Sequence, residues 1–256
     1  PLLQKLERDQ VPVIFNTSKT FEELKGWAEK LGNRHPMITE NGSALCLPVN
    51  YFAGSESSSS DSFQQIDSAY SETVLGVELA KIKHFIQQDK PNAIDFTECS
   101  IELAMKITGL DAVDAKAAQT RRYSIPLLFS DRDEEIVFTE KARKAGFETL
   151  KGGRFLHLQG ASDKGSAMLI LKQMYQTHFH KTYGIIALGD SNNDEAMLQQ
   201  ADIAVVVNSP SSHLLNLTHP QLIQTQHTAP QGWVEGVKSA FDAICFNGHT
   251  HNKFRS

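Results

Sequence analysis

Short apolar runs alternate with amphipathic segments in the first forty residues. An apolar run over 11–15 precedes a segment with helical spacing over 21–31, and a second apolar run covers 36–39. Gly32 is a helix stop signal, and residues 40–42 (ENG) form a turn signal. This order predicts a strand, a helix and a parallel strand.

The same alternation returns in the last third of the chain. The expected helices are 164–175 and 193–199, and the expected strands are 183–188 and 203–207. Near-continuous apolar strands between helices are typical of a parallel sheet with both faces covered. We therefore predict an α/β fold whose core is a Rossmann-like doubly wound parallel sheet.

Residues 76–158 have a different pattern and predict an inserted α+β domain, with 1–75 and 159–256 forming the core. From about Thr73, the apolar residues Val74, Val77, Ile82, Phe85 and Ile86 predict an amphipathic helix. Further helices are expected at 101–108, 111–119 and 134–145, and strands at 125–129 and 155–158. The polar stretch 54–62 predicts a mobile loop.

Composition narrows the classes of partner. The 256 residues are 40% hydrophobic and 21% charged, with a net charge of −5, which gives no basic footprint for nucleic acid. Apolar runs are too short to span a membrane, and no secretory signal is expected. Three widely spaced cysteines favour reduced thiols and a cytoplasmic protein. The oligomeric state has no signal in the sequence.

Polar residues follow three of the predicted core strands. Ser18, the pair Glu40-Asn41, and Asp190 all stand at carboxyl ends, where sheets of this type bind ligands. Asp190 and Asp194 are four residues apart, with Asn193 between them, and such carboxylates suit Mg²⁺ together with water and phosphate oxygens. Helix capping is the alternative role for Asp190.

Two further residues are candidates for binding phosphate. The Ser18 hydroxyl precedes a predicted helix N-terminus, where it is placed either to bind a phosphate oxygen or to cap the helix. Lys164 begins a predicted helix, where a cation is locally unfavourable, which indicates a partner anion. A solvated surface lysine is the alternative.

Ser18, Lys164, and Gly189-Asp190 with Asp194 together resemble motifs of the haloacid-dehalogenase-like phosphatases. The resemblance implies that Ser18 and Lys164 bind the transferring phosphoryl group and that Asp190 and Asp194 hold Mg²⁺. It also places the inserted domain where that family has its type-2 cap. A nucleophilic Asp-x-Asp strand, which forms an aspartyl-phosphate, completes the family's motifs.

Several short strings look like the mannosyl-3-phosphoglycerate phosphatases of this family, over about residues 1–240. They are 39–42 (TENG), Arg121 with Ser124 and Pro126, 152–155 (GGRF), 163–165 (DKG) and 232–233 (GW). The implied substrate is a phosphorylated sugar acid, with Arg121 and Arg154 clasping its carboxylate. The other implied substrate-binding residues are Lys19, Glu40, Asn41 and Asn193. Ile125 departs from the pattern, which has glutamate at this substrate-facing position.

The nucleophilic Asp-x-Asp is expected upstream of Pro1, because residues 2–6 look like the helix that follows it. Asp131-Arg132-Asp133 imitates the motif, but it follows the Ser18 motif and precedes two glutamates. We interpret it as a solvated acidic turn of a hairpin in the inserted domain. Two alternatives stay open: a phosphosugar mutase of the same superfamily, and an inactive module that binds a phosphorylated ligand.

Overall fold

The computed structural model describes residues 2–52 and 63–246 of the chain. They belong to two compact units, one of Leu6–Ser162 and one that combines Pro1–Lys5 with Asp163–Ser256. The predicted loop over 54–62 and the C-terminal tail lie outside the described residues. The predicted boundaries between core and inserted domain stay a prediction.

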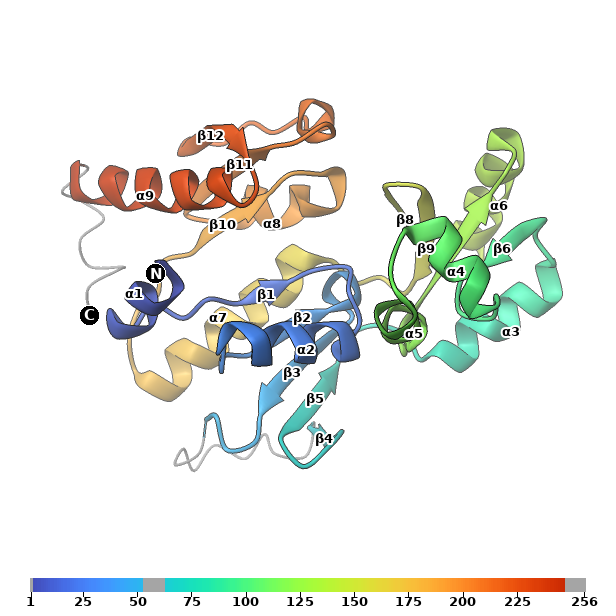
Figure 1. Cartoon of the computed structure of the whole chain (residues 1–256), viewed down its shortest axis with the longest axis horizontal. Coiled ribbons are helices and arrows are strands. Elements are labelled where there is room, and N and C mark those ends of the chain that lie inside the picture. The colour runs from blue at the N-terminus through green and yellow to red at the C-terminus, as the bar shows by residue number, and fades with distance from the viewer. Residues whose placement is uncertain (1, 53–62, 247–256) are drawn as a thin grey trace. The chain divides into compact units, whose positions relative to one another are not determined.

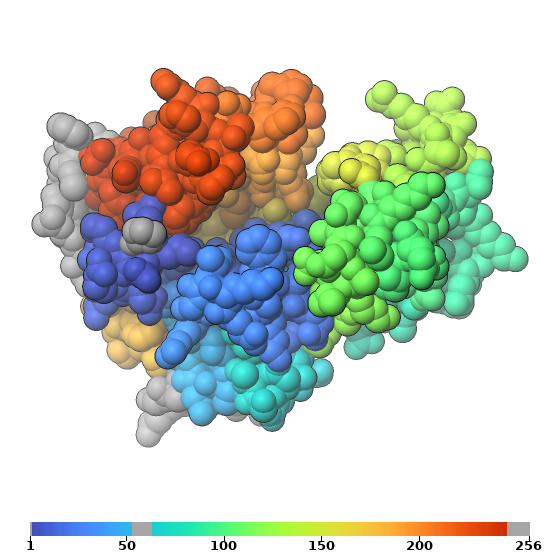
Figure 2. All heavy atoms as spheres, in the orientation of Figure 1, coloured from blue at the N-terminus to red at the C-terminus, as the bar shows by residue number. Residues whose placement is uncertain are grey.

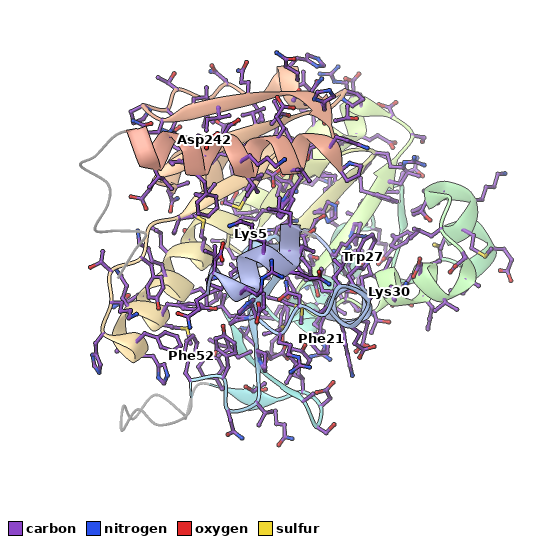
Figure 3. All side chains as sticks on the ribbon, turned by 60° about the vertical axis from the view of Figure 1, so that its left-hand side comes forward. Lys5, Phe21, Trp27, Lys30, Phe52 and Asp242 are labelled. Atoms are coloured by element: carbon purple, nitrogen blue, oxygen red, sulfur yellow. The ribbon has the colours of Figure 1, made fainter. Side chains whose placement is uncertain are left out.

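The first strand–helix–strand unit is present in Leu6–Ser162. Strand β1 (Phe15–Asn16) lies parallel to β2 (Met37–Thr39), and helix α2 (Phe21–Leu31) connects them. A capping box between Thr20 and Glu23 begins α2, and Gly32, with φ of 66°, ends it. Figure 3 labels Phe21, which is buried against the sheet, and Trp27, which is half exposed on the same helix. The predicted helix is confirmed, but the strand begins later than the apolar run.

The remaining strands of this sheet are antiparallel. The strand order is β1-β2-β3-β5-β4, with β3 at Ala44–Pro48, β4 at Gln64–Gln65 and β5 at Tyr70–Val74. Val74 pairs with Ala44 in this sheet, so its assignment to the following helix was wrong. Burial raises the pKa of Cys46 in β3 to about 12, so this thiol stays protonated and packs as an apolar side chain. Helix α1 (Leu2–Arg8) confirms the helix expected at the start.

A second sheet in the same unit is entirely antiparallel, with strand order β6-β7-β9-β8 (Figure 1). Its strands are Ala93–Asp95, Ser124–Phe129, Glu148–Gly152 and Phe155–Gln159 for β6 to β9. The helices are α3 (Leu79–Asp89), α4 (Ile101–Thr108), α5 (Ala112–Gln119) and α6 (Arg132–Lys144). Figure 2 shows the surface of α4 and α5 in green. This α+β arrangement is the one predicted for the inserted segment.

Ile125 lies in the core of this second sheet. Its side chain is fully buried in one cluster with Ile82 and Leu158. The expectation that position 125 faces substrate is therefore wrong in this structure.

The Asp163–Ser256 segment contains a parallel sheet, β10-β11-β12, in which β10 and β11 match the two predicted strands and β12 was not predicted. The strands are Ile186–Gly189, Ile203–Asn208 and Leu222–Thr228, and the main helices are α7 (Lys164–Phe179), α8 (Glu195–Gln200) and α9 (Gln231–Phe246). Alternate residues of β11 enter two different cores: Val205 packs with Ala240 of α9, whereas Ala204 packs with Leu198 of α8. Helices thus cover both faces, which explains the continuous apolar run of β11.

Two helical glycines predict opposite effects on stability. A Cβ at Gly236 of α9 would lie 2.4 Å from Val205 Cγ1 in the buried core, whereas a Cβ at Gly26 of α2 meets nothing within 4 Å. We expect Gly236→Ala to lower the free energy of unfolding by about 1–3 kcal/mol through overpacking, and Gly26→Ala to raise it by about 0.5–1 kcal/mol. Urea denaturation of both variants measures the difference, and equal shifts would contradict the packing of α9 on β11.

Every helix in the described part of the chain is too short or too polar to cross a bilayer.

Candidate functional site

The predicted metal loop follows β10 directly. A 3₁₀ turn over Asn192–Asp194 links the strand to α8 and buries Asp194. Asp194 Oδ2 accepts hydrogen bonds from the N–H groups of Asp190 (3.0 Å) and Ser191 (3.1 Å). Its Oδ1 accepts one from Lys164 Nζ at 2.6 Å. Both oxygens of Asp194 are therefore held by donors of the protein itself.

Gly189 is required by the close approach of this loop. A Cβ at position 189 would lie 2.4 Å from Asp194 Cβ and 2.7 Å from its Cγ. Real Cβ atoms do not come so close, so any side chain at 189 would displace the carboxylate. The glycine in the motif thus fixes where Asp194 lies.

The carboxylate of Asp190 differs from that of Asp194 because it is half-buried and not engaged. The backbone of Asp190 is held, since its carbonyl accepts from Ser209 Oγ (3.3 Å) and Ser211 Oγ (3.4 Å). Among the hydrogen bonds of the described residues, none reaches its side-chain oxygens. Neighbouring Asn193 accepts a hydrogen bond from Ser191 Oγ at 2.5 Å. The backbone is thus fixed while one carboxylate is available to a ligand.

This donor set fits a magnesium ion that takes few protein ligands. Residues 2–52 and 63–246 contain no group of three or more His, Cys, Asp or Glu side chains arranged around one metal position. Mg²⁺ is commonly held by one or two carboxylates, with water and substrate phosphate completing its shell. Asp190 can supply one such carboxylate, and Asp194 can act through water or by orienting its neighbours.

Lys164 is the first residue of α7, as the sequence predicts, and it is buried rather than solvated. Asp163 caps the helix by accepting from the N–H groups of Gly165 and Ser166. The side chains of Lys164 and Asp194 are only 5% and 8% exposed. The helix dipole disfavours a cation at a helix N-terminus, so the carboxylate of Asp194 beside it explains why Lys164 can be buried here. The alternative of a surface lysine is excluded.

The Ser18 loop lies in the other unit and is held by its carbonyl groups. The carbonyls of Thr17 and Lys19 accept hydrogen bonds from the N–H groups of Asn41 and Glu40, both at 2.9 Å. The Ser18 carbonyl accepts from Arg121 Nη1 at 3.1 Å. No hydrogen bond among the described residues uses the Ser18 hydroxyl or its N–H group. The helix cap is Thr20, so Ser18 keeps a hydroxyl donor for a ligand.

The turn after β2 brings Glu40 and Asn41 beside that loop. Their φ angles of 46° and 58° are in the left-handed region, which is uncommon for residues other than glycine. Glu40 is 1% exposed, and its carboxylate accepts from the N–H groups of Arg122 (2.9 Å) and Tyr123 (3.2 Å) and from Ser124 Oγ (2.6 Å). Asn41 Nδ2 donates to Gln159 Oε1 at 3.2 Å. Both predicted substrate-binding side chains are thus bonded within the protein.

The other predicted substrate-binding residues are more open. Lys19 is partly exposed, and its Nζ lies 2.7 Å from Glu23 Oε1. Arg154 is exposed in the turn between β8 and β9. The structure thus leaves Arg154 accessible, while Arg121 is engaged with the Ser18 loop.

Asp131 has a different role from the one expected. Its side chain accepts hydrogen bonds from the N–H groups of Asp133 and Glu134 and caps α6. The acidic segment therefore begins a helix, and its interpretation as a hairpin turn was wrong. Its first aspartate is explained by capping.

Sequence reasoning missed Ser124 and Gln159 as parts of this region. Ser124 binds Glu40, 84 positions earlier, and Gln159 binds Asn41, 118 positions earlier. Neither contact has a local signal, although Ser124 belongs to one of the strings that carried the resemblance.

Comparisons with known proteins agree on one family for this chain. The sequence profile of haloacid dehalogenase-like hydrolases matches residues 2–227. A glucosyl-3-phosphoglycerate/mannosyl-3-phosphoglycerate phosphatase of Persephonella marina is 29% identical over 240 residues, which cover 93% of this chain and 87% of the relative. One with the same name from Methanococcoides burtonii is 32% identical over 247 residues, with the same coverage. A solved haloacid dehalogenase-like hydrolase from B. subtilis superposes with a TM-score of 0.62 at 14% identity, covering 94% of this chain and 90% of that one.

Proposed function

Because the chain belongs to the haloacid dehalogenase-like hydrolase family, we propose that it is a magnesium-dependent phosphatase acting on a phosphorylated sugar acid. The observation that carries the proposal is the buried Lys164–Asp194 pair beside the available carboxylate of Asp190. Such an arrangement of one cation and two carboxylates suits a site for magnesium and phosphate. The names of the two relatives support mannosyl-3-phosphoglycerate or its glucosyl counterpart as the substrate.

Each predicted residue has a proposed role in phosphoryl transfer. Ser18 would donate its hydroxyl and N–H groups to phosphoryl oxygens, and the Lys164 ammonium group would neutralise phosphoryl charge, as the resemblance implies. Asp190 and Asp194 would hold magnesium directly or through water, and Asp194 also holds Lys164 in place. Magnesium, when bound, supplies positive charge that stabilises the transferring phosphoryl group.

The sugar-acid end of the substrate requires a cationic partner. A guanidinium group suits a carboxylate because it donates two parallel hydrogen bonds. Arg154 is exposed and satisfies this requirement best. Arg121 is a second candidate for binding the carboxylate, through the N–H groups that do not bind the Ser18 loop. Lys19 and Asn193 are candidates for polar contacts with the substrate.

A panel of phosphorylated substrates tests the function. We expect the protein to release inorganic phosphate from mannosyl- or glucosyl-3-phosphoglycerate when magnesium is present, and to lose this activity in excess EDTA. Colorimetric phosphate detection together with ³¹P NMR of the organic product measures the result. Migration of the phosphate within a hexose phosphate would instead support a mutase, and tight binding without turnover would support a binding module.

A further inference from the structure

A chain of hydrogen bonds connects the Ser18 loop with the buried carboxylate of Glu40. Arg121 Nη1 donates to the Ser18 carbonyl at 3.1 Å and to Ser124 Oγ at 3.0 Å. Ser124 Oγ in turn donates to Glu40 Oε2 at 2.6 Å. The hydroxyl of Ser124 thus accepts from the cation and donates to the anion, and it joins two charged groups that are not paired directly.

Glu40 also binds the Ser18 loop through its backbone. Its N–H group donates to the Lys19 carbonyl, and the next N–H group, of Asn41, donates to the Thr17 carbonyl. With Arg121 on Ser18, three successive carbonyls of the loop are held by donors. A loop whose carbonyls all point into the protein has fewer conformations available, which favours the one in which the Ser18 hydroxyl and N–H group are open to a ligand.

The burial of Glu40 determines what its side chain can do. It is 1% exposed, and each carboxylate oxygen already accepts at least one hydrogen bond. The carboxylate has almost no surface that a substrate hydroxyl could reach, and pulling it away from these donors would leave a buried charge without its partners. Glu40 therefore acts on other parts of the protein and not on the substrate.

We propose that Glu40, Ser124 and Arg121 form a positioning relay that holds the Ser18 loop in its phosphate-binding conformation. The phosphate-binding role of the relay rests on the proposed function of Ser18, whereas its effect on the conformation of the loop does not. It replaces the expectation that Glu40 is a substrate ligand. It also connects the loop to the first residue of β7, so that the antiparallel sheet and the phosphate-binding loop are held by one set of bonds.

The substitution Ser124→Ala tests the relay with the least disturbance. Alanine removes the bridging hydroxyl, yet Glu40 keeps its bonds to the N–H groups of Arg122 and Tyr123. Ser43→Ala is the matched control, because Ser43 is equally buried in the same unit and its hydroxyl bonds Ser162 Oγ at 2.9 Å, away from the Ser18 loop. Each variant loses one buried hydroxyl, and urea denaturation should show a somewhat larger loss of stability in Ser124→Ala, because its hydroxyl bonds charged groups.

Two readouts separate positioning from general stability. Hydrogen exchange followed by mass spectrometry should show faster exchange over residues 15–20 in Ser124→Ala than in Ser43→Ala. Calorimetry of the protein with inorganic phosphate and magnesium should show affinity weakened roughly three- to tenfold by Ser124→Ala, the range expected for one hydrogen bond, and unchanged by Ser43→Ala.

Equal exchange over residues 15–20 in the two variants would overturn the relay, whatever happens to phosphate binding. If the unmodified protein bound no phosphate, the proposed function would fail, and the exchange experiment would still decide the relay. Glu40→Gln adds a check, because the amide keeps one oxygen and must point its NH₂ group at the N–H group of residue 122 or of residue 123. If Glu40→Gln left exchange over 15–20 unchanged, Glu40 would have no positioning role.

Discussion

Replacing Asp190 with asparagine is expected to weaken magnesium binding by at least about 100-fold. The carboxylate of Asp190 is half-buried, and none of the hydrogen bonds among the described residues reaches it, so the substitution removes negative charge from the site without breaking a contact of the fold. Substitution of a residue that only hydrogen-bonds a metal ligand typically lowers metal affinity by about 10–100-fold. Loss of a carboxylate that binds the metal itself should lower the affinity at least as much. The Asp190 N–H and C=O groups keep their bonds, which should preserve the loop.

Calorimetry of the protein with MgCl₂ measures this effect, and thermal unfolding gives a second readout. Magnesium at about 100 times its dissociation constant stabilises a folded protein by about 2.7 kcal/mol, and Asp190→Asn should lose most of that increment. Asp202→Asn is the control, because Asp202 is a partly exposed carboxylate of the same unit that pairs with Lys172. Unchanged magnesium affinity in Asp190→Asn would remove the metal assignment.

Local signals explain the part of the fold that the sequence predicts well. Helix α2 has the predicted bounds because Thr20 and Glu23 form its capping box and Gly32 ends it. Helix α7 begins at Lys164, as predicted, because Asp163 caps it. The metal loop is likewise a local motif, with Gly189, Asp190 and Asp194 within six residues. In these segments the determinants of structure lie within a few residues of the structure that they determine.

The errors arise where contacts are distant in sequence. Val74 fits a helical period, but its pairing with Ala44 in the sheet decides its structure. Glu40 looks like an exposed turn residue from its neighbours, yet residues 122–124 bury and bind its carboxylate. Ile125 looks like a substrate-facing position by resemblance, but it packs in a core with Ile82 and Leu158. Burial by distant segments has no local signature, so roles that depend on exposure are the ones that the sequence alone predicts least well.

The substitution Lys164→Met should have the largest effect on stability, because it leaves a buried carboxylate without its cation. The Lys164 Nζ–Asp194 Oδ1 distance is 2.6 Å, and both side chains are almost fully buried. Removing one partner of such a pair costs about 3–5 kcal/mol, whereas relief of the unfavourable helix dipole returns up to about 2 kcal/mol when the charge is buried. We therefore expect the free energy of unfolding to fall by at least about 1 kcal/mol, as measured by urea denaturation.

Lys172→Met is the matched control, because Lys172 is on the same helix and pairs with Asp202 at 3.2 Å, where both side chains are about 20% exposed. Pairs that are closer to solvent contribute about 0–1 kcal/mol, so this variant should lose much less stability.

Adding Asp194→Asn to Lys164→Met removes the uncompensated charge, and we expect the double variant to be more stable than the sum of the two single effects predicts. A strictly additive cycle would mean that Asp194 is held mainly by the N–H groups of Asp190 and Ser191. The ion pair with Asp194 would then add nothing to the free energy of unfolding, and the burial of Lys164 would be explained by its proposed role in binding phosphate.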